Sequence, residues 1–340
     1  VLALSEVGMK RERVLRVAVV GTGEWWGREH ARLYASRPDT ELVAILGRTP
    51  DKTRARAGEF GVAGYTELTP LLDEQRPDLM SVCLPNEGHY ETTLEIIRAG
   101  VPLLVEKPLV FDLAQADTLL DEAAQRDLWF GINFNHRYAK PVHLAKAAID
   151  AGELGPISFA TWRFGGEIGD SEHAQASLIE TQCHGLDMLE HLCGPIDSVM
   201  AQMTDPAGHG YTTMSVALGF ASGAIGSLVG SYDSSYAYPG TQLLEVNGRD
   251  GRVLIEDTVR RYTFNRAGDE TAQVWQAGYF NDPERMFHRI FDRHANAYLE
   301  AFRAGEAPPV HARAGRRALA LAYAIIESFE TGRRVATPDR

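Results

Sequence analysis

The sequence contains little cysteine: 3 of its 340 residues, Cys83, Cys183 and Cys193. An odd and low count excludes a disulfide framework and fits a reducing compartment, so we expect a cytoplasmic protein. Long apolar runs are missing as well, because no stretch approaches the ~20 apolar residues that a membrane span requires. The run at 1–4 is too short for a signal peptide and precedes the nearby basic residues, so residues 1–12 are expected to form a loose leader.

Basic residues are outnumbered. Lys and Arg total 34 against 46 Asp and Glu, which gives a formal net charge of −12. An acidic chain without a long basic block is a poor candidate for binding nucleic acid or an anionic membrane, although it can still hold a local pocket for one phosphate. The remaining composition, 44% hydrophobic and 24% charged, is typical of a globular protein. The length is about twice the ~150 residues of one domain and predicts two domains.

The first half alternates between short apolar runs and helical segments. The run at 14–20 is rich in β-branched residues and ends at Gly21, which is typical of a buried strand. Because strand and helix keep alternating, the order predicts an α/β domain with a doubly wound parallel sheet and helices on both faces. We expect strands at 14–20, 41–46, 79–84, 103–105 and 128–133, and helices at 25–36, 51–60, 88–99 and 112–126.

The second half has a different pattern, typical of an α+β domain. From 213 to 220, large apolar residues alternate with small ones, which predicts a strand with one covered face and one small-residue face. We expect a predominantly antiparallel (mixed) open sheet over 156–264, interrupted by one helix near 180–193 and followed by helices at 284–304 and 312–331. The small-residue face predicts self-association as a homodimer or homotetramer. The expected domains are 13–136 and 137–335.

A glycine-rich turn joins the first strand to the first helix. The segment 21–27 has the spacing G-x-G-x-x-x-G, one residue longer than the usual dinucleotide fingerprint. Glycines at such a turn let the backbone approach a diphosphate, which the N–H groups of the following helix can bind. An ordinary tight turn is the alternative. The expected cofactor contacts here are Gly21, Thr22, Gly23, Glu24, Trp25 and Trp26, although the two tryptophans could instead pack the domain.

The end of the second strand lacks a carboxylate. In NAD-type sites an Asp or Glu about 20 residues further on binds the ribose hydroxyls. Here the strand ends in Leu46-Gly47-Arg48-Thr49. A carboxylate would repel a 2′-phosphate, whereas Arg48 would attract it and could stack on the adenine. The sequence therefore favours NADP(H) over NAD(H), with Arg48 and Thr49 as contacts. A solvated surface base is the other interpretation of Arg48.

Short motifs along the whole chain carry a further signal. They are Gly21-Thr22-Gly23, Pro85-Asn86 with His89, Glu106-Lys107-Pro108, Asn135-His136-Arg137-Tyr138, the segment 180–194, Pro308-Pro309-Val310, Arg317-Ala318-Leu319 and Thr331-Gly332-Arg333. From residue 14 to about 335 the chain resembles the glucose–fructose oxidoreductase/inositol dehydrogenase/MocA (Gfo/Idh/MocA) family. The resemblance implies an N-terminal Rossmann domain, a C-terminal mixed sheet that often builds oligomers, and hydride exchange between a nicotinamide and a sugar or polyol carbon.

Two polar motifs follow strands of the expected parallel sheet. Ligands of such sheets lie beyond the carboxyl ends of the strands, so Leu84-Pro85-Asn86 and Glu106-Lys107 should border the nicotinamide. Alcohol oxidation moves a hydride to the cofactor and a proton elsewhere, and a Lys107 ammonium can stabilise the alkoxide or relay that proton. Glu106 would oppose a lowered pKa of Lys107 unless its side chain points away. Taken alone, Lys107 would be an ordinary surface lysine; the resemblance makes it a contact of substrate and nicotinamide. His89 and Asn135 complete the expected cofactor contacts.

Acids and histidines recur at helical spacing in the second half. Glu180, His184, Asp187 and His191 are spaced i, i+4, i+7 and i+11, so on one helix they would share a face. Histidine exchanges protons near neutral pH, and a carboxylate can orient it. The family pattern is D-x-G-x-H-x-x-D: His184 matches its histidine, the presumed proton donor or acceptor, and Asp187 its last acid. Glu180 and Gln182 depart from it, which makes substrate identities less transferable, and His191 is expected to be structural.

The same segment raises the question of a metal. Cys183, His184, Asp187, His191 and Cys193 are chemically plausible zinc ligands, but neither C-x-x-C nor H-E-x-x-H is present, so no metal is expected. The expected substrate contacts are Lys107, Arg137, Trp162, Arg163, Glu180 and His184, with Asn135, Tyr236 and Tyr238 as weaker candidates.

The sequence thus predicts an NADP(H)-preferring oxidoreductase that acts on a secondary alcohol or keto carbon of a sugar, polyol or sugar derivative. Lys107 would polarise the oxygen, His184 would exchange the proton, and Glu180 would hold a hydroxyl or orient His184. The alternatives are an NAD-dependent glycosidase that uses transient oxidation and a non-catalytic NADP(H)-sensing protein.

Overall fold

The computed structural model describes residues 13–86, 88–167, 169, 173–206, 208, 210–278, 280 and 285–337. The expected leader at 1–12 lies outside these residues. The contacts within the chain divide it into two compact units, Val1–Val105 with Glu122–Leu128, and Glu106–Asp121 with Trp129–Arg340. Within the described ranges, no helix combines the length and the apolar character needed to cross a membrane.

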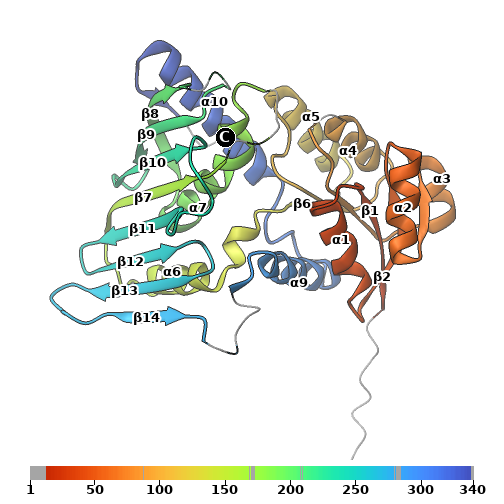
Figure 1. The fold of residues 1–340 in the computed structure, drawn as a ribbon, viewed down its shortest axis with the longest axis horizontal. Coiled ribbons are helices and arrows are strands. Elements are labelled where there is room, and N and C mark those ends of the chain that lie inside the picture. Colours follow the sequence, from red (N-terminus) through yellow and green to blue (C-terminus); the bar gives the residue numbers. More distant parts are fainter. Residues whose placement is uncertain are drawn as a thin grey trace, which may run out of the picture. The chain divides into compact units, whose positions relative to one another are not determined.

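Six strands form a parallel sheet in the order β3-β2-β1-β4-β5-β6 (Figure 1). The strands are β1 (Leu15–Val20), β2 (Thr40–Leu46), β3 (Ala63–Tyr65), β4 (Leu79–Val82), β5 (Leu103–Val105) and β6 (Phe130–Ile132). The pairs of β1 with β2 and β4, and of β2 with β3, are all parallel. Val17, Ala18 and Val19 in the central strand are 0% exposed. Burial on both faces explains why these strands are continuous apolar runs in the sequence.

Helices connect these strands. They are α1 (Trp26–Ala35), α2 (Pro50–Phe60), α3 (Leu68–Gln75), α4 (His89–Arg98) and α5 (Leu113–Ala124). The limits of α2 follow from two residues: Pro50 occupies its first turn, and Gly61, at φ +66°, ends it in the left-handed conformation. The alternation confirms the predicted doubly wound arrangement. It brings the carboxyl ends of β1, β2 and β4 to one edge of the sheet.

Nine strands form a second sheet in the order β14-β13-β12-β11-β7-β10-β9-β8-β15 (Figure 1). The strands are β7 (Ile157–Gly165), β8 (Ile196–Thr204), β9 (Thr213–Phe220), β10 (Ile225–Ser231), β11 (Gln242–Gly248), β12 (Gly251–Glu256), β13 (Arg261–Arg266), β14 (Gln273–Gln276) and β15 (Val335–Ala336). β10 pairs with β7 in parallel, and the other neighbouring pairs are antiparallel. The predicted mixed, mostly antiparallel sheet is confirmed.

Helices cover one face of the second sheet. α6 (Lys140–Asp150) packs on β12 and β13, α7 (Cys183–Cys193) on β7, and α10 (Arg313–Thr331) on β8, whereas α9 (Arg289–Ala304) packs on the short helix η1 (Asn135–Tyr138). β9 alternates as predicted: Val216 and Leu218 are buried, and Ser215 and Ala217 on the other face are exposed. Ile225 of β10, at 66% exposure, lies on this open face as well.

The helix expected near 180–193 is not a single α-helix. Ser177–Gln182 form a π-helical segment, η2, and α7 begins at Cys183. A π-helix bonds each residue to the fifth along the chain, so its turn is wider than an α-helical one. The 3.6-residue spacing assumed between Glu180 and His184 therefore does not hold across the junction of η2 and α7.

Candidate active site

The turn between β1 and α1 is tightly packed at two glycines and open at the third. Gly21 has φ +137°, and a Cβ there would lie 2.4 Å from the backbone oxygen of Cys83. At Gly27 a Cβ would lie 3.0 Å from the backbone oxygen of Gly21. At Gly23, in contrast, a Cβ would meet nothing closer than the Gly27 nitrogen at 3.9 Å. The turn thus packs against the residue that follows β4 and leaves space beside Gly23.

A buried arginine supports this turn. Arg56 of α2 is 5% exposed, and its Nη2 lies 3.4 Å from the Gly23 backbone oxygen and 2.9 Å from a carboxylate oxygen of Glu24. A further ion pair joins Arg56 to Glu59. Because Arg56 neutralises Glu24, the turn keeps the positive potential that the N-terminus of α1 offers to an anionic ligand.

The other predicted residues of the turn differ in exposure. Thr22 packs against the end of β2, where a Cβ at Gly47 would lie 2.4 Å from its Cγ2. Trp25 is 63% exposed, whereas the Trp26 ring meets His30 edge-on with centroids 6.4 Å apart. Of the two tryptophans, Trp25 is the more exposed.

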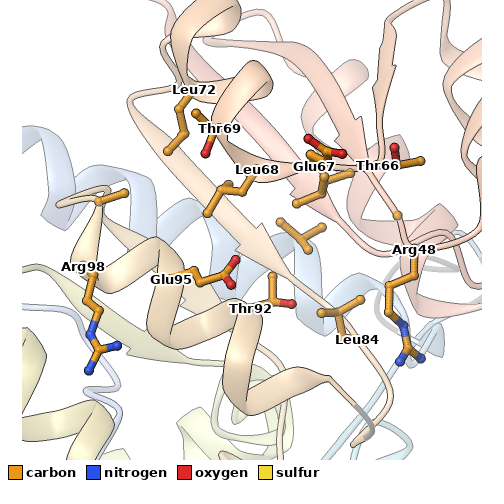
Figure 2. A pocket seen from close by; sticks show the side chains of 14 residues that line it. Arg48, Thr66, Glu67, Leu68, Thr69, Leu72, Leu84, Thr92, Glu95 and Arg98 are labelled. Carbon is orange, nitrogen blue, oxygen red and sulfur yellow. The ribbon is translucent and has the colours of Figure 1, made fainter.

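A cavity of about 540 Å³ opens at the carboxyl ends of β2 and β4 (Figure 2). Arg48 and Leu84, both predicted as cofactor contacts, line it. A Cβ at Gly88 would lie 3.2 Å from Arg48 Nη1, so the guanidinium lies against the backbone of Gly88. Three other charged side chains line the cavity, from the residue before α3 and from α4, and they were not predicted because they belong to no recognised motif. They are Glu67, Glu95 and Arg98.

The remaining predicted contacts of the first unit lie at the same sheet edge. Thr49, Pro85 and Asn86 are exposed, and the Thr49 carbonyl accepts the Thr53 hydroxyl at 2.9 Å. His89 is 4% exposed, and its Nδ1 lies 3.3 Å from the Leu84 carbonyl oxygen. The close glycine turn, the N-terminus of α1 and the cavity with Arg48 together fit a dinucleotide: a diphosphate at the turn and an adenosine at the strand ends.

In the second unit, Lys107 reaches the π-helical segment. Its Nζ donates to the backbone oxygen of Glu180 at 3.1 Å. The neighbouring Glu106 is 6% exposed, and its carboxylate accepts hydrogen bonds from the Asn133 amide and, at 3.3 Å, from the Lys107 backbone N–H. Asn133 Oδ1 in turn lies 2.7 Å from Nδ1 of the buried His294. Glu106 is thus held by Asn133, while the Lys107 side chain extends to η2.

His184 lies in the first turn of α7 and is 7% exposed. Its ring stacks on that of His136, with centroids 3.9 Å apart and 6° between the planes. Burial, followed by the influence of His136 and of Lys107, lowers the pKa of His184 well below 6.5. His184 is therefore neutral near pH 7 and able to accept a proton.

Gln182, which stands where the family pattern has glycine, ties η2 to the second sheet. It is 0% exposed, and its Nε2 donates to the Phe164 carbonyl and to the Tyr232 hydroxyl, each at 3.0 Å. Its Oε1 accepts the indole N–H of Trp162 at 2.9 Å. A Cβ at Gly230 would lie 2.3 Å from Gln182 Nε2, so a side chain at this position would displace the Gln182 amide. Trp162, predicted as a substrate contact, is 1% exposed and lies in this core.

Glu180 lines a cavity of about 270 Å³ in the second unit. Two tyrosines, a histidine and a second acid contribute to its walls: Tyr232, Tyr236, His173 and Glu167. This is the hydrogen-bonding and aromatic lining that suits a polyhydroxylated ligand.

Two other predicted substrate contacts, Arg137 and Arg163, form hydrogen bonds within the second unit. Arg137 binds Asp187 through two hydrogen bonds, of 2.8 and 2.5 Å, and burial raises the pKa of Asp187 while Arg137 lowers it. Arg163 is exposed and donates to the Gly240 carbonyl at 2.7 Å. Asn135 is 2% exposed.

The last weak candidate, Tyr238, is 63% exposed. Among the residues described, no group of three or more His, Cys, Asp or Glu side chains is arranged to hold a metal ion.

Comparison with protein families decides the identity of this fold. A model described as "Oxidoreductase family, NAD-binding Rossmann fold" matches residues 15–134, and the "GFO/IDH/MocA C-terminal domain" matches residues 142–254. The chain belongs to the Gfo/Idh/MocA family. It is an oxidoreductase, and its two sheets are those of the family's N-terminal and C-terminal domains.

Relatives and solved structures agree with this assignment. D-glucoside 3-dehydrogenase of Escherichia coli is 34% identical over 44% of this chain and 43% of its own length. Myo-inositol 2-dehydrogenase of Thermotoga maritima is 26% identical over 94% of this chain and 98% of its own length. Levoglucosan dehydrogenase in complex with NADH superimposes with a TM-score of 0.85 over 96% of this chain and all of that chain, at 18% identity, which shows a shared fold.

Proposed function

We propose that this protein exchanges a hydride between NADP(H) and a secondary alcohol or keto carbon of a sugar, polyol or sugar derivative. The names of its relatives support the substrate class, since they include dehydrogenases of a glucoside, of myo-inositol and, in Haloferax volcanii, of D-xylose with NADP(+). The xylose enzyme is 27% identical over 87% of this chain and 91% of its own length.

The observation that carries the proposal is the contact between the Lys107 side chain and η2, the segment directly before the helix that bears His184. The Lys107 ammonium donates to the Glu180 backbone oxygen at 3.1 Å, and it is near enough to His184 to help lower its pKa. Alcohol oxidation needs a proton acceptor and a group that stabilises the developing oxyanion, and a neutral imidazole and an ammonium can fill these two roles. Lys107 would stabilise the developing negative charge on the substrate oxygen, and His184 would take the hydroxyl proton. Glu180 would hold a neighbouring hydroxyl in the cavity that it lines.

The residues of the first unit would hold the cofactor. Gly21 and Gly23 would receive the diphosphate at the N-terminus of α1, with Trp25 over it, and Arg48 would bind the 2′-phosphate at the end of β2. A bound nicotinamide would supply the hydride acceptor or donor. The absence of an acid after Leu46 supports NADP(H), because a carboxylate there would repel the extra phosphate.

Two further proposals concern the setting of the reaction. The three cysteines are free and buried, which supports a reducing compartment such as the cytoplasm. The open face of the second sheet, with exposed Ser215, Ala217 and Ile225, supports a homodimer or homotetramer. A light-scattering mass of one chain at micromolar concentration would exclude such self-association.

A spectrophotometric panel tests the proposed function. Sugars, inositols and keto-sugars are offered with each nicotinamide cofactor, and at least one compound should change the absorbance of the reduced nicotinamide. Lys107→Ala and His184→Ala should each lower kcat at least ~100-fold with that compound. Lys146→Ala, which removes an ammonium paired with Asp150 on α6, is the matched control and should keep wild-type turnover. Near-normal turnover in either site variant contradicts the assignment, and release of a leaving group without net reduction indicates the glycosidase alternative.

A further inference from the structure

Two buried histidines from different elements stack face to face. His136 in η1 and His184 in α7 are 3% and 7% exposed, and their ring planes differ by 6°. Other aromatic rings close the stack: Phe134 meets His184 at 5.9 Å, and Phe287 meets His136 at 5.2 Å, both edge-on. The proposed function uses His184 and gives His136 no role.

The stack fixes the plane of the His184 ring without a hydrogen bond at Nδ1. Among the described residues, the Nδ1 atoms of His136 and His184 have no hydrogen-bond partner. Ring N–H bonds lie in the plane of the ring, so two face-to-face imidazoles cannot donate to each other, which excludes direct proton transfer between them. The stack therefore acts on His184 by packing. The terminal side-chain torsion of a histidine has a broad range, and a flat ring whose centroid lies 3.9 Å away restricts rotation about it.

We propose that His136 is a positioning residue for His184. This inference rests on the proposed function, in which a ring nitrogen of His184 must face the substrate hydroxyl to accept its proton. By covering one face of the ring, His136 keeps that nitrogen in a fixed plane and keeps His184 neutral until the substrate binds. A displacement of about 1 Å in a catalytic group can cost about 100-fold in rate, so orientation by stacking is a large effect.

Charge around the pair favours two neutral rings. Burial and the nearby Lys107 ammonium lower the pKa of His136 to about 3. Burial, His136 and Lys107 together lower the pKa of His184. Two stacked imidazoles beside an ammonium repel each other when both are protonated. Removing the imidazole of His136 should therefore raise the proton affinity of His184.

The titratable neighbours on α7 and η1 supply no unpaired negative charge near neutral pH. On α7, Asp187 is neutralised by Arg137 of η1, and burial raises the pKa of Cys183 to about 12, so its thiol stays uncharged. Burial also raises the pKa of Tyr138 in η1 to about 12. Among the described residues, further titratable side chains on the neighbouring segments are Glu180 of η2 and His288, whose ring meets that of Phe287 edge-on.

Two substitutions at position 136 separate orientation from charge. His136→Ala removes the stacking ring, and His136→Phe keeps a flat ring but removes the second imidazole. His191→Phe is the matched control, because it replaces another histidine of α7 outside the stack. We would measure kcat and KM over about pH 4 to 9 with the best compound of the panel. In parallel, ring carbon–proton NMR signals of His184, assigned by their loss in His184→Ala, would be followed without any substrate.

We expect His136→Ala to lower kcat about 10- to 100-fold with KM changed less than about threefold. His136→Phe should retain most of kcat but move both the acid-side fall of kcat/KM and the NMR midpoint of His184 to higher pH. His191→Phe should leave kcat, the acid-side fall of kcat/KM and the NMR midpoint of His184 unchanged. Wild-type kcat in His136→Ala, or an unmoved NMR midpoint in His136→Phe, overturns the proposal. If His184→Ala keeps its turnover, the proposed function fails instead, and the NMR measurement still decides whether His136 controls His184.

Discussion

Two neutral histidines, the buried His136 and the half-buried His191, should make this protein sensitive to mild acid. Burial is the main cause that lowers the pKa of His136 from 6.5 to about 3 and that of His191 from 6.5 to about 4. In the unfolded chain the pKa values of both histidines return to about 6.5. The unfolded state therefore binds more protons below about pH 6.5, so stability is complete above that pH and is lost as the pH falls toward 4 and 3.

The size of the effect follows from these shifts. At about pH 5 each histidine is almost fully protonated when unfolded and almost fully neutral when folded, so unfolding takes up about one proton at each. At about 1.4 kcal/mol for each pKa unit, the loss between pH 7.5 and 5 is about 2 kcal/mol per histidine. His136→Phe and His191→Phe should each remove about one proton and about 2 kcal/mol of this pH dependence.

Calorimetric unfolding in two buffers of different ionisation enthalpy counts those protons. At about pH 5, each single variant should take up about one proton fewer than wild type, and the double variant about two fewer. Proton uptake equal to wild type in His136→Phe would show that His136 is already protonated in the folded protein. That result would refute both the burial argument and the neutral stack built on it.

Two further predictions concern the cofactor-binding unit. Gly21→Ala should weaken both nicotinamide cofactors and destabilise the fold by about 1–3 kcal/mol, because its Cβ would lie 2.4 Å from the Cys83 oxygen at φ +137°. Gly58→Ala in α2, where a Cβ meets nothing within 4 Å, should be neutral or stabilising in the same thermal and titration assays. Arg48→Ala should weaken NADPH about 10- to 100-fold and NADH less than about threefold, measured by fluorescence titration. Arg54→Ala, which removes an exposed arginine of α2 outside the cavity, is the control and should leave both affinities unchanged. Equal losses for both cofactors in Arg48→Ala would refute the phosphate role.

The strands of the first unit were predictable because strands that are buried on both faces consist of consecutive apolar residues. β3 was missed: Ala63–Tyr65 has three residues and a half-buried pattern, too short for such a run. α6 was also missed, because no helix was expected between the domain boundary after residue 136 and the second sheet. Proline is tolerated in the first turn of a helix, and that is where Pro141 stands.

For the candidate site, sequence motifs name candidate residues but not their contacts. Lys107 and His184 were found from strand-end and family motifs, yet the hydrogen bond from Lys107 to Glu180 joins residues 73 positions apart. The stack of His136 on His184 and the anchoring of Gln182 by Trp162 likewise depend on tertiary packing, which no local pattern records. The ion pair between Arg137 and Asp187, 50 positions apart, is another such contact.

A double-variant cycle on Lys107 and His184 tests most directly whether the two groups act on one substrate oxygen. The rate of nicotinamide reduction would be compared in wild type, Lys107→Ala, His184→Ala and the double variant, with one panel compound at saturating cofactor. Groups that act as a unit are strongly non-additive, so the double variant should be at most about tenfold slower than the slower single variant. If the fold-decrease in rate of the double variant equals the product of the two single decreases, the ammonium and the imidazole work independently. That result would contradict the account.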